Sequence, residues 1–180
     1  MRICLICTEK LPVPPVRGGA IQIYVEEVAQ RLRHRAEVTV ISRDDPALPR
    51  FQQVRGVSYV RLPGGSREEY YRAVVRYLQA APAFDVIDLF NRPTFFLPVA
   101  RAAKGARLVL SLHNDLLGPD RIDPAEACAV LGTADAVVTI SDYVRRGVAE
   151  RYPRWAGKLH TIRSGVDVRR FRPGWEAVER

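Results

Sequence analysis

Short runs of apolar residues alternate with longer amphipathic segments along the chain. The short runs are rich in β-branched residues and are bounded by Gly, Pro, Asp and Ser, which is the pattern of strands. Two of them, residues 108–110 and 136–138, are wholly apolar, as expected of strands that are buried on both faces. The predicted strands cover residues 3–7, 37–42, 57–62, 85–90, 107–112, 136–140 and 158–162.

Between these strands, apolar residues recur every three or four positions, and this spacing predicts helices that bury one face. Ser66 and Asp123 each precede a glutamate by three residues, which is the capping-box pattern of a helix start. Ser141 is the predicted N-cap of the last helix, and Pro82 ends an earlier one. The predicted helices cover residues 20–33, 66–81, 93–103, 123–132 and 141–153, and the predicted loops include residues 11–17 and 43–53.

Strands that alternate with helices are typical of βαβ units and a mostly parallel sheet. We therefore predict an α/β, Rossmann-like fold with about seven mostly parallel strands and helices on both faces. A length of 180 residues suits one domain of ordinary size. The sequence from Phe171 to Trp175 has no partner element, so we expect residues 1–165 to form the domain and residues 166–180 to begin a linker.

The composition is that of a globular, basic protein, with 47% hydrophobic residues and a formal net charge of +8. The excess of arginine suits phosphate-bearing ligands, an anionic membrane surface or nucleic acid, and a solvated arginine-rich surface explains it equally well. No nucleic-acid-binding motif accompanies the charge, so we expect no nucleic-acid partner. The chain has no apolar run near the roughly 20 residues that span a bilayer and no signal-peptide pattern, so we expect a cytoplasmic location.

Peripheral contact with the inner face of a membrane is an open alternative. The predicted helix after Ser66 mixes cations with aromatic rings, which suits an anionic interface. A helix that turns its aromatic side toward the core gives the same pattern. The residues concerned are Arg67, Arg72, Arg76, Tyr70, Tyr71 and Tyr77.

The cysteines include a C-x-x-C pair, Cys4 and Cys7, at a spacing found in metal and redox sites. Both lie in the first predicted strand, where residues three apart point to opposite faces. The two thiols should therefore not converge on one metal ion, and Cys128 is distant in sequence. We interpret all three cysteines as small buried apolar residues and expect no metal site.

Polar residues follow the predicted strands at the points where the strands end. In an open parallel sheet, ligands bind beyond the carboxyl ends of the strands. This rule selects candidates for a binding site from their positions in the sequence alone. They are Thr8, Glu9, Gly18, Gly19, Asn91, Arg92, His113, Asn114, Asp115, Ser141, Arg163, Ser164 and Gly165.

Two of these candidates have the most specific chemistry. Gly18-Gly19 stands between a strand and a helix, where free N–H groups and the helix dipole favour an anion, although an ordinary turn gives the same pair. His113 directly follows a strand, where it can donate to a sugar hydroxyl, act as an acid or base, or cap local backbone. Glu9 can accept from a substrate hydroxyl or remain solvated, and Ser141 can be an N-cap alone.

Motifs of several other enzyme classes are missing from the sequence. It contains no G-x-G-x-x-G, no G-x-x-x-x-G-K-[ST] and no G-x-S-x-G. The simple dinucleotide-binding, NTPase and hydrolase interpretations therefore lose support.

Several segments instead follow one another in a recognisable order. They are residues 15–20 (PVRGGA) with 36–41 (AEVTVI), then 109–114 (VLSLHN), then 134–141 (ADAVVTIS), and finally 164–167 (SGVD) with 171–173 (FRP). Together they resemble glycosyltransferases of the GT-B fold and the large family 4 type, and among them those of spore coat or cell-surface polysaccharide synthesis. The similarity covers essentially the whole chain. One departure is Ser164, where the family usually has asparagine.

The resemblance implies two Rossmann-like domains that face a cleft, with the acceptor bound mainly by the first and a nucleotide sugar by the second. It also implies transfer with retained anomeric configuration and without a metal ion or other cofactor. By position, Gly18 and Gly19 would approach the donor diphosphate. His113 would contact the transferred sugar as the catalytic residue.

Roles are also expected of the remaining candidates. Acceptor or substrate contacts are expected of Glu9, Asn91, Asn114 and Ser141, and a hinge between the two domains is expected at Gly165 and Asp167. The expected partners are a nucleotide sugar, a glycan or lipid-linked acceptor, and a C-terminal, donor-binding domain beginning where this sequence stops.

The sequence thus favours the N-terminal, acceptor-binding half of a retaining glycosyltransferase that makes a cell-surface or spore-coat glycan. We expect the isolated chain to be inactive, because half of the preorganised site would lie on the missing domain. The alternative is a stand-alone α/β module that binds a small ligand or has a regulatory role.

Overall fold

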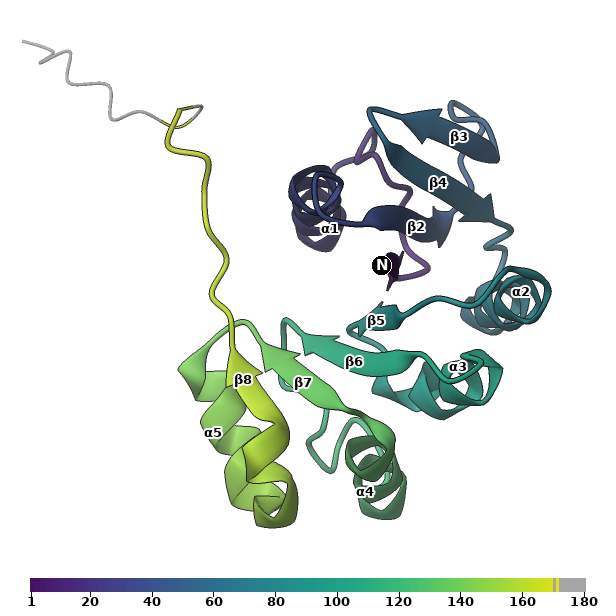
Figure 1. Ribbon diagram of the computed structural model, residues 1–180. Helices are drawn as coiled ribbons and strands as arrows, with labels where there is room; N and C mark the ends of the chain where they lie inside the picture. The colour runs from purple at the N-terminus through teal and green to yellow at the C-terminus, as the bar shows by residue number, and fades with distance from the viewer. Residues whose placement is uncertain (170, 172–180) are drawn as a thin grey trace, which may run out of the picture.

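A computed structural model describes residues 1–169 and residue 171 of the chain. The strands form one eight-stranded sheet in the order β3-β4-β2-β1-β5-β6-β7-β8 (Figure 1). They are β1 (Arg2–Ile6), β2 (Glu37–Arg43), β3 (Phe51–Val54), β4 (Val57–Leu62), β5 (Val86–Phe90), β6 (Arg107–Leu112), β7 (Ala136–Thr139) and β8 (Leu159–Thr161). Neighbouring strands pair in parallel except β3 and β4, so the predicted mostly parallel sheet is confirmed.

Strand β3 lies mostly within residues that the sequence predicts as a loop. It pairs antiparallel with β4 at the edge of the sheet, across a tight turn in which Arg55 and Gly56 have φ angles of 50° and 81°. An edge strand has one free side, and Gln52 and Gln53 are compatible with that position. Because these residues are polar, β3 does not stand out as an apolar run in the sequence. The sheet therefore has one strand more than the sequence predicts.

Helices cover both faces of the sheet, as the sequence predicts (Figure 1). Helices α2, α3 and α4 pack on one face, α1 packs against β2 on the other, and α5 packs against β7 and β8. The bounds are α1 (Ala20–Leu32), α2 (Arg67–Ala80), η1 (Pro93–Phe95), α3 (Phe96–Ala102), α4 (Pro124–Thr133), α5 (Asp142–Arg151) and η2 (Pro153–Lys158), where η marks a 3₁₀ turn.

The capping residues predicted from the sequence are in place. Ser66 Oγ accepts a hydrogen bond from the backbone N–H of Glu69 at 3.1 Å. Asp123 caps α4 through its carboxylate, which accepts from the first backbone N–H groups of that helix. Each cap satisfies an N–H group that the helix itself leaves unpaired.

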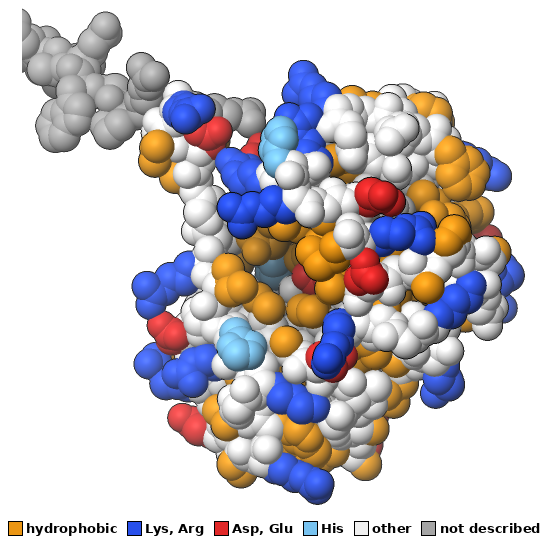
Figure 2. Space-filling model, viewed as in Figure 1, with side chains coloured by type: hydrophobic (Ala, Val, Ile, Leu, Met, Phe, Trp, Pro, Cys, Tyr) orange, Lys and Arg blue, Asp and Glu red, His pale blue; other side chains and the backbone are white. Residues whose placement is uncertain are grey.

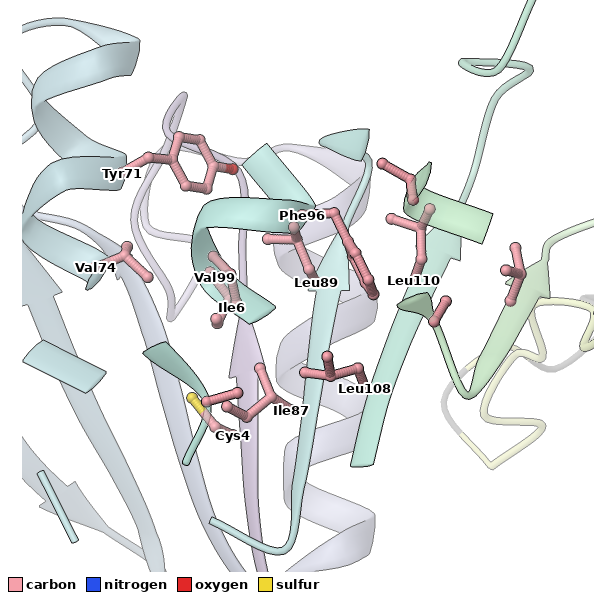
Figure 3. Close-up of a cluster of buried hydrophobic side chains, with 14 of the residues drawn as sticks. Cys4, Ile6, Tyr71, Val74, Ile87, Leu89, Phe96, Val99, Leu108 and Leu110 are labelled. Atoms are coloured by element: carbon pink, nitrogen blue, oxygen red, sulfur yellow. The ribbon is translucent and has the colours of Figure 1, made fainter. Parts of the chain in front are cut away.

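Apolar side chains form one core on each face of the sheet. The larger core lies between the sheet and α2–α4 and includes Ile87 and Leu89 of β5 and Phe96 of α3 (Figure 3). Cys4 belongs to this core and Cys7 to the smaller core under α1, so the two thiols lie on opposite faces, as their spacing predicts. Burial raises the pKa of both thiols, that of Cys7 to about 12. These cysteines are therefore inert packing residues.

Helix α2 turns its tyrosines inward. Tyr70 and Tyr71 are fully buried, and the Tyr70 hydroxyl donates to the carbonyl of Cys7 at 3.0 Å. The exposed side of the helix carries Arg72 and Arg76 without these rings. The aromatic part of the membrane-interface pattern thus serves core packing. Within the described part of the chain, no helix combines the length and the apolarity needed to cross a bilayer.

Candidate functional site

Strand order changes direction at β1, which has β2 on one side and β5 on the other. Connections that diverge from such a switch point leave a crevice beyond the carboxyl ends of the two central strands, and ligands of open α/β sheets bind there. Glu9 follows β1, Asn91 follows β5, and His113 follows the next strand, β6. The fold therefore brings these three predicted site residues to one edge of the sheet.

The glycine pair forms the turn into α1, with Gly19 as the N-cap residue. Gly18 and Gly19 have φ angles of +78° and +99°, which L side chains rarely adopt. A Cβ on Gly19 would lie 2.2 Å from Oε1 of Gln22, whereas a Cβ on Gly18 would meet no atom of the described residues within 4 Å. No side chain caps α1 and its first turn holds no acidic residue, so its N–H groups can face an anion.

Buried hydrogen bonds hold the loop that precedes the glycine pair. The N–H of Val13 donates to Ser42 Oγ at 3.0 Å, and its carbonyl accepts from Nε of Arg61 at 2.9 Å. Arg61 is only 1% exposed. Gln22, in the first turn of α1, donates to the carbonyl of Leu11 at 3.4 Å. These contacts fix the start of α1 relative to the sheet.

His113 lies beside the start of α1. Its half-buried ring packs edge-on against Tyr24 at a centroid distance of 4.7 Å and against Phe90 at 5.9 Å. Tyr24 is the fifth residue of α1, so the histidine packs against the second turn of that helix, one turn after the glycine pair. Desolvation lowers the pKa of His113 below its usual 6.5. Burial thus favours the neutral imidazole, which offers one donor and one acceptor nitrogen.

Asn91 is buried and supports the backbone of His113. It has a φ of 53°, in the left-handed region that asparagine tolerates better than most residues. Its Oδ1 accepts from the N–H of His113 at 2.6 Å, and its own N–H donates to the carbonyl of Ser111 at 2.8 Å. The side-chain nitrogen and the second lone pair of Oδ1 are left for the predicted contact of Asn91 with an acceptor.

Glu9 forms a bidentate ion pair with Arg92 in the same crevice. The two nitrogen–oxygen distances are 2.6 and 2.8 Å, and the side chains are only 13% and 17% exposed. Each carboxylate oxygen accepts one hydrogen bond from Arg92 and keeps one further acceptor site, so a substrate hydroxyl at Glu9 would share the carboxylate with Arg92.

The other candidates lie around this edge. Asn114 is exposed next to His113 and is open to a ligand. Ser141 Oγ accepts from the N–H of Val144 at 3.3 Å, so its hydroxyl caps α5. Arg163 pairs with Asp142, at 2.6 Å, in the first turn of α5.

A cavity of about 760 Å³ lies between α1 and the segment that follows β8. Tyr24 lines it from α1, and Gly165 and Asp167, the predicted hinge residues, line it from the other side. Asp167 also reaches Arg31 of α1, with a closest distance of 3.8 Å. Figure 2 shows the molecule hollowed beside this segment, with apolar side chains around the hollow and a histidine inside it. Residues 170 and 172–180 of the predicted linker lie outside the described residues.

Asp88 lies within β5 and is not selected by the rule that places ligands beyond the ends of strands. It lies on β5, where Ser111 Oγ donates to its Oδ2 at 3.0 Å, and its buried Oδ1 has no partner among the described residues. Burial raises the pKa of this carboxyl to about 7. A single carboxylate within the apolar run of residues 86–90 was the available sequence signal. Within residues 1–169 and 171, no three histidines, cysteines or carboxylates gather as metal ligands.

Comparison with known proteins identifies the family of the chain. Residues 18–170 match the model of a family described as Glycosyltransferase Family 4. The chain is 41% identical to Spore coat protein SA of Bacillus subtilis (strain 168) over 175 residues, which cover 97% of this chain and 45% of that protein. It is 37% identical to Putative glycosyltransferase YtcC of the same strain, again over 175 residues, with 97% and 42% covered.

Among solved structures, the chain resembles Anabaena Alr3699/HepE, crystallised in complex with UDP and glucose. The TM-score is 0.60 at 19% identity, and the match covers 94% of this chain and 46% of that one. This likeness concerns the fold. The chain spans a little under half the length of the curated relatives that it matches.

Proposed function

The chain belongs to glycosyltransferase family 4, and we propose that it is the N-terminal, acceptor-side half of an enzyme that moves a sugar from a nucleotide-sugar donor to a glycan or lipid-linked acceptor. The observation that carries the proposal is the packing of His113 against Tyr24 of α1, beyond the carboxyl ends of the strands and beside the switch point of the sheet. The imidazole can hydrogen-bond a sugar hydroxyl, and the N–H groups at the start of α1 can bind a diphosphate.

In the proposed reaction, the donor diphosphate lies against the first turn of α1. Negative charge grows on the leaving phosphate as its bond to the sugar breaks, and the N–H groups and dipole of α1 stabilise that charge. Gly18 has no side chain, and the space where a Cβ would stand is open, so a phosphate can approach the backbone. The hydrogen bonds of the loop before the glycine pair keep these N–H groups in place before the nucleotide sugar binds.

His113 is the proposed catalytic residue. Its neutral ring would hydrogen-bond a hydroxyl of the transferred sugar and hold the anomeric carbon beside the diphosphate. Packing against Tyr24 and Phe90 restricts the ring to one region of the crevice. We propose that transfer retains the anomeric configuration and needs no metal ion, as the family resemblance implies.

The relatives suggest the substrate class. Spore coat protein SA is named for the spore coat, and the structure of HepE holds UDP and glucose. We propose a UDP-linked hexose as the donor and a cell-surface or spore-coat glycan as the acceptor. The isolated chain would be inactive because the remaining donor contacts would come from a second domain, joined through residues 166–180.

A chimera tests this function. Residues 1–165 of this chain replace the matching half of Spore coat protein SA, and release of nucleoside diphosphate is measured with a panel of UDP-, GDP- and ADP-sugars. We expect release by the chimera and none by the 180-residue chain alone. His113→Ala should lower the rate by roughly 10²-fold because the sugar is no longer held in place, while His160→Ala, at an exposed position on β8, should leave it unchanged.

Two results would speak against the proposal. Turnover by the 180-residue chain alone at the rate of the chimera would remove the half-enzyme interpretation. A folded chimera that turns over no donor in the panel would favour the alternative of a stand-alone binding or regulatory module.

A further inference from the structure

We propose that Asn91 is a positioning residue for His113, and that the ion pair between Glu9 and Arg92 locks Asn91 in this role. The inference rests on the proposed function only in that His113 acts in the transfer. The contacts that link these four residues are present in the chain itself.

The first link joins β1 to β5. Glu9 lies just after β1 and Arg92 just after β5. Their bidentate ion pair links the ends of these two strands at the switch point. Two parallel N–H···O bonds fix the plane of the guanidinium as well as its distance. The low exposure of both side chains shields the pair from water, so removing one partner would leave a poorly solvated charge.

The second link passes from Arg92 to the backbone of Asn91. Nη1 of Arg92 donates to the Asn91 carbonyl at 2.7 Å, while the ion pair holds the other side of the same guanidinium. This contact holds the peptide that follows the left-handed residue. A residue at a φ of 53° keeps that conformation only where its surroundings determine it.

The third link joins Asn91 to His113. The left-handed turn directs the Asn91 side chain toward β6, where Oδ1 accepts from the N–H of His113 at 2.6 Å. The N–H of Asn91 donates to the Ser111 carbonyl, two residues before the histidine. Asn91 therefore holds the C-terminal end of β6 through two hydrogen bonds. Because its side chain is buried, neither hydrogen bond has much room to shift.

The chain of contacts thus crosses three strands and ends at the backbone of the proposed catalytic histidine. Tyr24 and Phe90 confine the ring of His113, and Asn91 confines its backbone. A misplacement of about 1 Å in a catalytic group can cost roughly 100-fold in rate. Loss of the Asn91 contact should therefore lower the rate of transfer more than it weakens donor binding.

Three variants separate positioning from folding. Asn91→Gly keeps the positive φ without strain but removes the acceptor of the His113 N–H. Asn91→Asp keeps an acceptor oxygen of the same reach and serves as the conservative rescue. Arg55→Gly is the matched control, because Arg55 also has a positive φ, of 50°, and lies in the turn between β3 and β4.

In the chimera, we expect Asn91→Gly to lower kcat by roughly 10- to 100-fold with less than about a threefold change in the donor KM. Asn91→Asp should recover most of kcat, and Arg55→Gly should match the parent. An equal loss of kcat in the glycine and aspartate variants, or an unchanged kcat in the glycine variant, would overturn the proposal.

A second readout uses the 180-residue chain and needs no transferase activity. In Asn91→Gly, the backbone N–H of His113 should exchange with deuterium roughly tenfold faster, and its NMR resonance should move, while both stay unchanged in Arg55→Gly. If the parent chimera turns over no donor but this exchange rises, the proposed function fails and the positioning contact stands. If exchange at His113 is unaffected, the positioning contact fails whatever the chimera does.

Discussion

Gly19→Ala is expected to unfold the start of α1 and to abolish donor turnover in the chimera. Two costs add at this position. The φ of +99° is strained for any L side chain, and the new Cβ would lie 2.2 Å from Oε1 of Gln22 and 2.9 Å from Cδ1 of Leu11. Gln22 is buried and hydrogen-bonded to Leu11, so it has little room to move away. We expect a loss of about 2–4 kcal/mol in the free energy of unfolding.

Gly18→Ala separates the two roles of the glycine pair. Its Cβ would meet nothing within 4 Å, so only the φ of +78° is strained, and the expected cost in stability is about 1 kcal/mol. The methyl group would nevertheless occupy the side from which a phosphate approaches. We therefore expect Gly18→Ala to raise the donor KM strongly in a chimera that remains folded. Urea unfolding and donor turnover measured on both variants check this, and equal stability losses would contradict the clash at Gly19.

Asp88→Asn is expected to stabilise the chain above neutral pH. Burial raises the pKa of the folded-state carboxyl from 3.8 to about 7, so folding favours its protonated form. Its contribution to stability is complete below about pH 3.8 and is lost as the pH rises through about 7. Asparagine stays uncharged and can still accept from Ser111 Oγ. At pH 8 we expect a gain of roughly 2–4 kcal/mol in the free energy of unfolding, with little gain at pH 4.

Urea unfolding from pH 4 to pH 8 measures this difference. Asp120→Asn is the control, because it removes the same charge from an exposed loop. It should leave the slope of stability against pH unchanged, whereas Asp88→Asn should flatten it. A wild-type slope that survives in Asp88→Asn would show that another group titrates.

The elements of this fold could be predicted because their signals are local. Ser66 and Asp123 cap the helices that their capping boxes predict, since the contact spans only three residues. The parallel strands are short, mainly apolar runs, and their length, β-branched residues and flanking turn residues indicate strands. Strand β3 could not be predicted because it contains Gln52 and Gln53 and pairs with β4 through its backbone. Backbone pairing does not require an apolar sequence pattern.

The site could be predicted only in part. The rule of the carboxyl ends placed Glu9, Asn91 and His113 at one edge, and the structure brings them together there. It could not reveal that Glu9 is paired with Arg92, because that contact spans 83 positions. Nor could it show that Oδ1 of Asn91 accepts a hydrogen bond from the backbone N–H of His113, since the sequence is equally compatible with both residues as substrate ligands.

The central claim is that the glycine pair and His113 form one wall of a cleft for a sugar diphosphate. An amide-resolved NMR titration of the 180-residue chain with UDP tests it most directly. We predict weak binding, with a Kd of roughly 1 mM or above, and shift changes concentrated at residues 18–22 and at His113. The changes should shrink in Gly18→Ala. Changes centred elsewhere on the sheet, or none at the glycine pair at saturating UDP, would contradict the account.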